Sequence, residues 1–282
     1  MLNFESRNKK LILKYTKQSL FIFLKPNFEM KASDWDLIAK DYYTQVISPL
    51  KDCTANPLFS ELDFNSWDDK IVLDAGCGAG RLLPTLAKKF YYVYGKDFSK
   101  GMIEESKKVT KGMENVNCFV GDLKKSYNEK NKYDVLISVN SLLDPSVLNI
   151  TKIISVFYSS MKKGGIFLGV LPAMESYLYQ SMLFVDKKLA HSNAEKLVEK
   201  QMKKQLDAKN FDYSVGRIEF DGLYQKAFYE FEIKYRFQKA GFKNLKIGKV
   251  LYDWKEWREA GQTYYPKEQP PWDWYVKCEK PL

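Results

Sequence analysis

The stretch that decides the fold reads KIVLDAGCGAGRLLPTLAKKFYYVYGKDF and runs from Lys70 to Phe98. It begins with a continuous apolar run, Ile71 to Leu73, which ends in the acidic residue Asp74. Three glycines follow within five positions, namely Gly76, Gly78 and Gly80. This order predicts a buried strand, a tight turn and then a helix from Arg81 to Phe90. Glycine permits positive φ angles and lets a ligand approach the backbone closely, so the turn is a candidate binding loop.

A second short strand, Tyr91 to Lys96, ends in Asp97. Nucleotide-binding α/β proteins place a carboxylate about 20 residues beyond the glycine turn, where it holds the ribose hydroxyls. The glycine spacing is G-x-G-x-G, whereas the dinucleotide fingerprint is G-x-G-x-x-G. The third glycine therefore comes one position too early for a site that holds a pyrophosphate on the helix N-terminus.

The segment VLDAGCGAG, Val72 to Gly80, resembles the first motif (V/I)LDxGCGxG of the class I S-adenosylmethionine-dependent methyltransferases. GKDFSKGMIEESKK at Gly95 to Lys108 is similar to the GxDxSxxMxxxA segment of this family, and GDLKK at Gly121 to Lys125 is similar to its third motif. The resemblance covers Asp34 to Val170 and, more loosely, the end of the chain. It implies an α/β fold with a Rossmann-like doubly wound sheet, mostly parallel with an antiparallel last strand, and S-adenosyl-L-methionine as cofactor. The alternative is that the glycines form only a flexible loop.

The same resemblance implies roles for single residues in a cofactor site. Asp97 would hold the ribose, Asp122 and the Leu123 amide would bind the adenine edge, and Phe98 and Met102 would line the adenine pocket. Asp122 can also serve as a helix cap. The predicted cofactor-binding residues are Tyr42, Asp74, Ala75, Gly76, Cys77, Gly78, Gly80, Asp97, Phe98, Met102, Asp122, Leu123, Ser138 and Val139. Tyr42 or Tyr43 would reach the methionine carboxylate, although an aromatic core stripe explains these tyrosines equally well.

Outside this motif, hydrophobic periodicity and turn residues predict the remaining elements. The predicted helices cover residues 34–46, 99–112, 145–163, 173–209 and 229–240, and the predicted strands cover residues 117–120, 133–139, 165–171, 242–252 and 272–279. Lys162, Lys163 and Gly164 are typical of a helix C-terminus. A helical and extended insertion, residues 173–228, precedes the terminal hairpin, and we expect it to cap the substrate.

The first 29 residues combine a basic start with two apolar clusters, yet no cleavage site for a signal peptide follows. The segment is too short and too charged to span a bilayer, although an amphipathic helix on a membrane surface is an alternative. We expect a dispensable extension over residues 1–29 and a methyltransferase domain over residues 30–282.

The reactive methyl group is expected beside the strand 133–139, because ligands of such sheets bind at the carboxyl ends of the strands. Asn140 follows this strand, but the Pro-Pro-Tyr/Phe continuation typical of methyltransferases acting on nucleobase or glutamine amino groups is missing. The candidate catalytic residues are Asn140 and His191, the only histidine, for which a surface or lid position is the alternative.

Composition excludes some classes of protein. The four cysteines form no C-x-x-C pair and there is one histidine, so no metal site or disulfide framework is expected, and we predict a cytoplasmic protein. The net charge of +10 comes from lysines scattered along the chain. We predict methyl transfer to an O, N or C atom of a small-molecule acceptor. The alternatives are an RNA or protein methyltransferase, which the charge favours, and a regulatory protein that binds the cofactor without turnover.

Overall fold

The computed structural model describes residues 31–39, 48–51, 53–126, 128–190, 195–208, 211–220, 223–259 and 264–282. The predicted extension over residues 1–29, Tyr42 and His191 lie outside these residues. None of the described helices combines the length and the apolar composition needed to cross a lipid bilayer.

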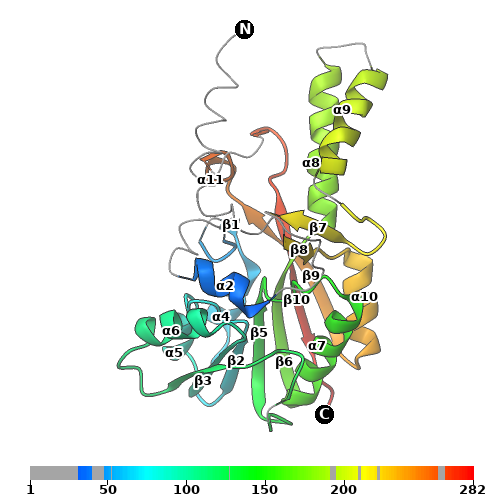
Figure 1. Ribbon diagram of the computed structural model, residues 1–282. Helices are drawn as coiled ribbons and strands as arrows, with labels where there is room; N and C mark the ends of the chain where they lie inside the picture. Colours follow the sequence, from blue (N-terminus) through cyan, green and yellow to red (C-terminus); the bar gives the residue numbers. More distant parts are fainter. Residues whose placement is uncertain are drawn as a thin grey trace.

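An eight-stranded sheet forms the centre of the molecule, with the order β1-β9-β10-β6-β5-β2-β3-β4 (Figure 1). The strands are β1 (Cys53–Ala55), β2 (Ile71–Ala75), β3 (Tyr92–Asp97), β4 (Val116–Val120), β5 (Tyr133–Val139), β6 (Met161–Pro172), β9 (Lys243–Tyr252) and β10 (Trp272–Glu279). Strands β6, β5, β2, β3 and β4 pair in parallel, whereas β10 runs antiparallel between β6 and β9. The predicted Rossmann-like sheet with an antiparallel last strand is thus confirmed. Strand β1, which adds an antiparallel edge beside β9, is not among the predicted strands.

Helices cover both faces of this sheet (Figure 1). On one face, α4 (Pro57–Phe64), α5 (Leu83–Ala87) and α6 (Lys100–Val109) enclose an apolar cluster that includes Val135 and Ile137 of β5. On the other, α7 (Val147–Ser160) and α10 (Glu230–Lys239) enclose a second cluster that includes Leu136. Successive residues of a strand point to opposite faces, so a sheet covered on both faces needs the continuous apolar runs that the sequence contains.

Helix α7 ends three residues earlier than the sequence predicts. It stops at Ser160, and β6 begins at Met161, which pairs with Tyr133 of β5. The Lys162 ammonium lies 2.8 Å from the Asp134 carboxylate instead of at the helix C-terminus. The prediction of a helix through Lys163 was therefore wrong. From Met161 onward the backbone pairs with β5 as a strand, so Lys162, Lys163 and Gly164 do not lie at a helix C-terminus.

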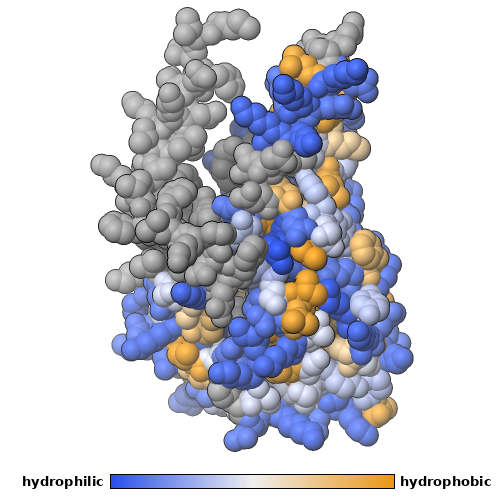
Figure 2. Space-filling view, turned by 45° about the vertical axis from the view of Figure 1, so that its right-hand side comes forward, coloured by the Kyte–Doolittle hydropathy of each residue, from blue (hydrophilic) through white to orange (hydrophobic). Residues whose placement is uncertain are grey.

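The insertion before the terminal hairpin contains two helices and a two-stranded ribbon, as expected. These elements are α8 (Met174–Leu189), α9 (Glu195–Ala208), β7 (Arg217–Phe220) and β8 (Leu223–Lys226). Helices α8 and α9 stand side by side and extend away from the sheet (Figure 1). Their surface is mainly hydrophilic in Figure 2, with exposed apolar side chains at Leu178, Met182 and Leu197.

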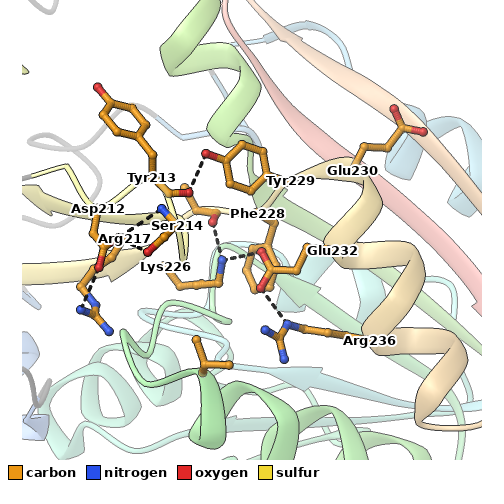
Figure 3. Close-up of polar contacts among 12 residues, drawn as sticks. Asp212, Tyr213, Ser214, Arg217, Lys226, Phe228, Tyr229, Glu230, Glu232 and Arg236 are labelled. Carbon is orange, nitrogen blue, oxygen red and sulfur yellow. Dashed lines mark hydrogen bonds and ion pairs between the residues drawn. The ribbon is translucent and has the colours of Figure 1, made fainter.

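A buried ion pair fastens the β7–β8 ribbon to α10 (Figure 3). The fully buried Lys226 ammonium donates to the Glu232 carboxylate at 2.6 Å and to the Ala227 carbonyl at 2.7 Å. The other oxygen of Glu232 accepts from Arg236 Nε at 2.7 Å. Burial lowers the pKa of Lys226, while Glu232 acts in the opposite direction. Buried charges persist only when they are paired, so this pair fixes where the insertion meets the body.

Candidate active site

The glycine turn joins β2 to α5 and is hydrogen-bonded to the end of β3. The backbone amides of Gly76 and Cys77 both donate to the Lys96 carbonyl, at 2.7 and 3.1 Å. The Gly80 amide donates to the Cys77 carbonyl at 3.0 Å. The φ angles of Gly76, Gly78 and Gly80 are 78°, 52° and 85°, in the left-handed region that other residues rarely adopt.

The three glycines differ in what a side chain would meet. A Cβ atom on Gly76 would lie 2.2 Å from Ser141 Cβ, and one on Gly80 would lie 2.9 Å from Ser106 Cα. A Cβ atom on Gly78 would meet no described atom within 4 Å. Packing thus accounts for Gly76 and Gly80, whereas Gly78 borders open space that a ligand can fill.

Asp97 lies at the carboxyl end of β3, directly beside this open space. One carboxylate oxygen accepts from the Gly78 amide at 3.0 Å, and the other accepts from the Ser99 amide at 2.9 Å. Burial raises the pKa of this carboxyl, against the lowering effect of these backbone amides. Each ionised oxygen can accept more than one hydrogen bond, so the carboxylate can also hold the two hydroxyls of a ribose.

Asp74, at the carboxyl end of β2, is a second buried acid of the turn. Burial, with the nearby charge of Asp97 as a smaller cause, raises its pKa to about 7. Burial makes it costly for both carboxyls to ionise. A cationic ligand is therefore favoured, because a positive charge nearby stabilises the ionised carboxylates. S-adenosylmethionine, which carries a sulfonium and an ammonium group, fits this environment, whereas a pyrophosphate would add negative charge.

Helix α2 (Ala32–Ile38) packs against the turn from outside the sheet. Ala39, just after the helix, is buried in a cluster with Ala79 and Met102. Asp36 anchors the helix to the start of α6, since its carboxylate accepts from Ser99 Oγ at 2.6 Å and from the Gly101 amide at 2.8 Å. Sequence reasoning missed Asp36, because no local pattern shows that it meets a helix start 63 residues away.

The residues predicted to bind adenine follow β4. The Gly121 amide donates to the Asp97 carbonyl at 2.8 Å, which brings Asp122 next to the end of β3. Asp122 accepts from the Lys124 amide at 2.8 Å, but a turn and not a helix follows it, so the alternative of a helix cap was wrong. Leu123 packs against the core, and Phe98 is half-buried at the end of β3.

The carboxyl end of β5 touches the glycine turn on one side. Ser141 Oγ donates to the Ala75 carbonyl at 2.5 Å and lies 2.7 Å from Ser138 Oγ. Val139 is half-buried and packs against the core. On the other side, Asn140 Nδ2 donates to the Asp273 carboxylate at 2.9 Å. Asp273 was not predicted, because its contact with Asn140 joins positions 133 residues apart.

Comparison with known proteins identifies the domain and the fold. Residues 72–165 match a family model described as a methyltransferase domain. No curated protein sequence matches the chain. Among solved structures, a SAM-dependent methyltransferase from Methanosarcina mazei is 15% identical and superposes with a TM-score of 0.54, covering 81% of this chain and 99% of its own. A Haloferax volcanii protein solved with the Trm112 methyltransferase activator is 14% identical, with a TM-score of 0.57 and coverages of 91% and 98%.

A third similar structure is the geranyl diphosphate C-methyltransferase from Streptomyces coelicolor, solved with Mg2+, geranyl diphosphate and S-adenosyl-L-homocysteine. It is 12% identical, with a TM-score of 0.51 and a coverage of 79% of each chain. At such identities the likeness shows the fold, while the family model matches the segment that carries the glycine turn and Asp97. Residues 72–165 therefore carry a methyltransferase domain, on the fold that S-adenosylmethionine-dependent methyltransferases share.

Proposed function

We propose that this methyltransferase transfers its methyl group to an O, N or C atom of a small-molecule acceptor. The bound cofactor supplies a methyl group already activated by the sulfonium. The protein must therefore align the acceptor atom with the S–C bond and exclude water. The observation that carries the proposal is that the insertion is hydrogen-bonded directly to the carboxyl ends of β5 and β6 and to the start of β10.

Several backbone contacts fasten the insertion there. The Phe228 amide donates to the Pro172 carbonyl of β6 at 2.7 Å, and the Lys226 amide donates to the Leu143 carbonyl after β5 at 3.0 Å. At the start of β10, the Trp272 amide donates to Ser176 Oγ of α8 at 2.9 Å. A cover held by these hydrogen bonds at this edge can seat a small acceptor beside the reactive methyl group.

On the cofactor side, we assign roles that follow the contacts described above. Asp97 binds the ribose hydroxyls, and Gly78 lets the nucleoside approach the backbone. Asp74 favours the positive charges of the ligand. The remaining predicted residues line the site: Tyr42, Ala75, Gly76, Cys77, Gly80, Phe98, Met102, Asp122, Leu123, Ser138 and Val139.

An RNA or protein acceptor is the second candidate, and one feature favours it. The far part of α8 and all of α9 carry exposed lysines on the arm that extends from the body: Lys187, Lys188, Lys196, Lys200, Lys203 and Lys204. Such a basic arm can bind phosphates or acidic peptides without sequence preference.

Transfer of tritium from methyl-labelled S-adenosylmethionine separates these candidates. The full chain is incubated with a cell extract divided into small-molecule, RNA and protein fractions. We expect label in the small-molecule fraction with the wild type. The Asp97→Ala variant should lose about 10²-fold or more in cofactor affinity, because each hydrogen bond to a charged group contributes about 1.5–3 kcal/mol. Label confined to RNA or protein would contradict a small acceptor, and unchanged affinity in Asp97→Ala would contradict the assigned cofactor site.

A further inference from the structure

A buried polar cluster lies on the substrate side of β5 and has no role in holding the glycine turn. It consists of Asn140, Asp273 and Tyr252, which come from the ends of three different strands. One oxygen of the Asp273 carboxylate accepts from Asn140 Nδ2 at 2.9 Å and from the Tyr252 hydroxyl at 2.6 Å. Because β10 is antiparallel to its neighbours, its first residues reach the same sheet edge as the carboxyl ends of β5 and β9.

Asn140 is held firmly at this edge. Its φ angle is 45°, in the left-handed region that asparagine tolerates better than most residues. Its backbone amide donates to the Val170 carbonyl at 2.8 Å. The next residue, Ser141, donates to the Ala75 carbonyl beside the glycine turn. Asn140 thus connects the cofactor turn on one side with Asp273 on the other.

The amide oxygen of Asn140 is the unusual atom of the cluster. It is shielded from solvent and has no hydrogen-bond partner within the described part of the chain. A buried carbonyl without a partner destabilises the protein, so its retention points to a ligand that satisfies it. The carboxylate can only accept hydrogen bonds, so it turns the NH2 group of the amide toward itself and leaves the oxygen for a donor.

Resting on the proposed function, we propose that the Asn140 amide oxygen accepts a hydrogen bond from the N–H of the methyl acceptor, with Asp273 and Tyr252 as positioning residues. An amide oxygen is too weak a base to deprotonate a hydroxyl, and Asp273 already accepts from two side chains of the cluster. A neutral amine nitrogen needs no prior deprotonation, because its lone pair is available while it carries hydrogen. The lone pair forms the N–C bond as the sulfonium S–C bond breaks, the sulfur keeps the electron pair, and the proton passes to water.

The orientation of Asn140 depends on the ionised form of Asp273. Burial raises the pKa of Asp273 to about 6, against the lowering effects of Tyr252, Asn140 and the Ala173 amide. The other titratable group that faces it is Tyr177 on α8, which burial keeps neutral by raising its pKa. Below about pH 6 the protonated carboxyl can donate to the amide oxygen and remove the acceptor. Methyl transfer should therefore increase as the pH rises through about 6.

The test begins with the product. The labelled small molecule formed by the wild-type chain is isolated and its methylated atom identified by mass spectrometry and NMR. An N-methyl product supports the proposal, and an O-, C- or S-methyl product overturns it. Failure of the wild type to label any fraction would overturn the proposed function and this inference together. If only RNA or protein is labelled, the proposal of a small-molecule acceptor is wrong. The variants described below then test the role of Asn140 separately.

The variants separate the role of Asn140 from structural effects. Asn140→Gly removes the side chain without straining the left-handed backbone, and should lower the turnover number about tenfold to a hundredfold with the cofactor affinity within about twofold. The matched control is Asn244→Gly, because Asn244 has a φ of 54° and donates to a β10 carboxylate, Glu279, at 2.8 Å. Asn244 lies at the other end of β9, so this variant should transfer methyl groups like the wild type.

Tyr252→Phe tests the positioning role. Loss of its hydrogen bond raises the pKa of Asp273, so the pH of half-maximal transfer should move upward. A merely structural role would lower the rate without moving this midpoint. An unchanged turnover number in Asn140→Gly, or an unchanged midpoint in Tyr252→Phe, would refute the assignment while leaving methyl transfer itself established.

Discussion

A methyl group added at Gly78 tests the cofactor site most directly. A Cβ atom there would meet no described atom within 4 Å, so any steric effect of Gly78→Ala comes from the ligand. Filling space that a ligand needs costs about 1–3 kcal/mol by analogy with overpacked cores, which corresponds to about a 5- to 150-fold weaker affinity. Titration calorimetry with S-adenosylmethionine measures this loss. The left-handed backbone adds about 1–2 kcal/mol of destabilisation, or roughly 2–8 °C in melting temperature.

Gly112 provides the control for the destabilisation that alanine causes in a left-handed backbone. Its φ is 85°, a Cβ atom there would also meet nothing within 4 Å among the described residues, and it follows α6 at the opposite edge of the sheet. Gly112→Ala should therefore lose a similar amount of stability but bind the cofactor like the wild type. If Gly78→Ala also kept wild-type affinity, the space beside the glycine turn would not be the nucleoside site, and the reasoning from Gly78 would be wrong.

Two more predictions concern buried charges. Lowering the pH from about 8 to about 6 should weaken S-adenosylmethionine binding up to about tenfold, because Asp74, with its pKa of about 7, loses the negative charge that favours a cation. Calorimetry over this pH range should give a flat profile for Asp74→Asn, and an equally steep one would contradict the role of Asp74. Lys226→Met should lower the free energy of unfolding by about 3 kcal/mol, since it leaves Glu232 buried without its ammonium. In denaturant unfolding, Lys234→Met at an exposed pair is the control and should cost no more than about 1 kcal/mol.

The sequence predicted the parts of the molecule that local chemistry determines. The apolar run before Asp74 predicted a buried strand, the glycine spacing predicted the turn after it, and Tyr91 to Lys96 predicted the next strand. Helix α6 begins at Lys100, one residue after the predicted start, and the Ser99 side chain caps it by accepting from the Met102 amide at 3.0 Å. At Lys162 the local signal for a helix C-terminus was overridden, because the backbone there pairs with β5 as a strand.

The substrate side could not be predicted in the same way. Tyr252 and Asp273 are ordinary residues at the ends of two strands, and nothing near them in the sequence indicates a common partner. Their meeting with Asn140 depends on the register of β10 against β6 and β9, which aligns Asp273 with Pro172 and Val250. Most residues predicted to bind the cofactor thus lie in one contiguous segment of the sequence, whereas the acceptor side depends on contacts between distant positions.

The reversed direction of β10 has a practical consequence for handling the protein. The strand enters the sheet at the reactive edge with Trp272 and leaves at the far edge, where the Lys280 amide donates to the Gly165 carbonyl at 2.9 Å. Leu282 lies there with 94% of its surface exposed. A surface linkage attached at Leu282 would project from the back of the enzyme, so immobilised protein should keep its reactive edge open to cofactor and acceptor.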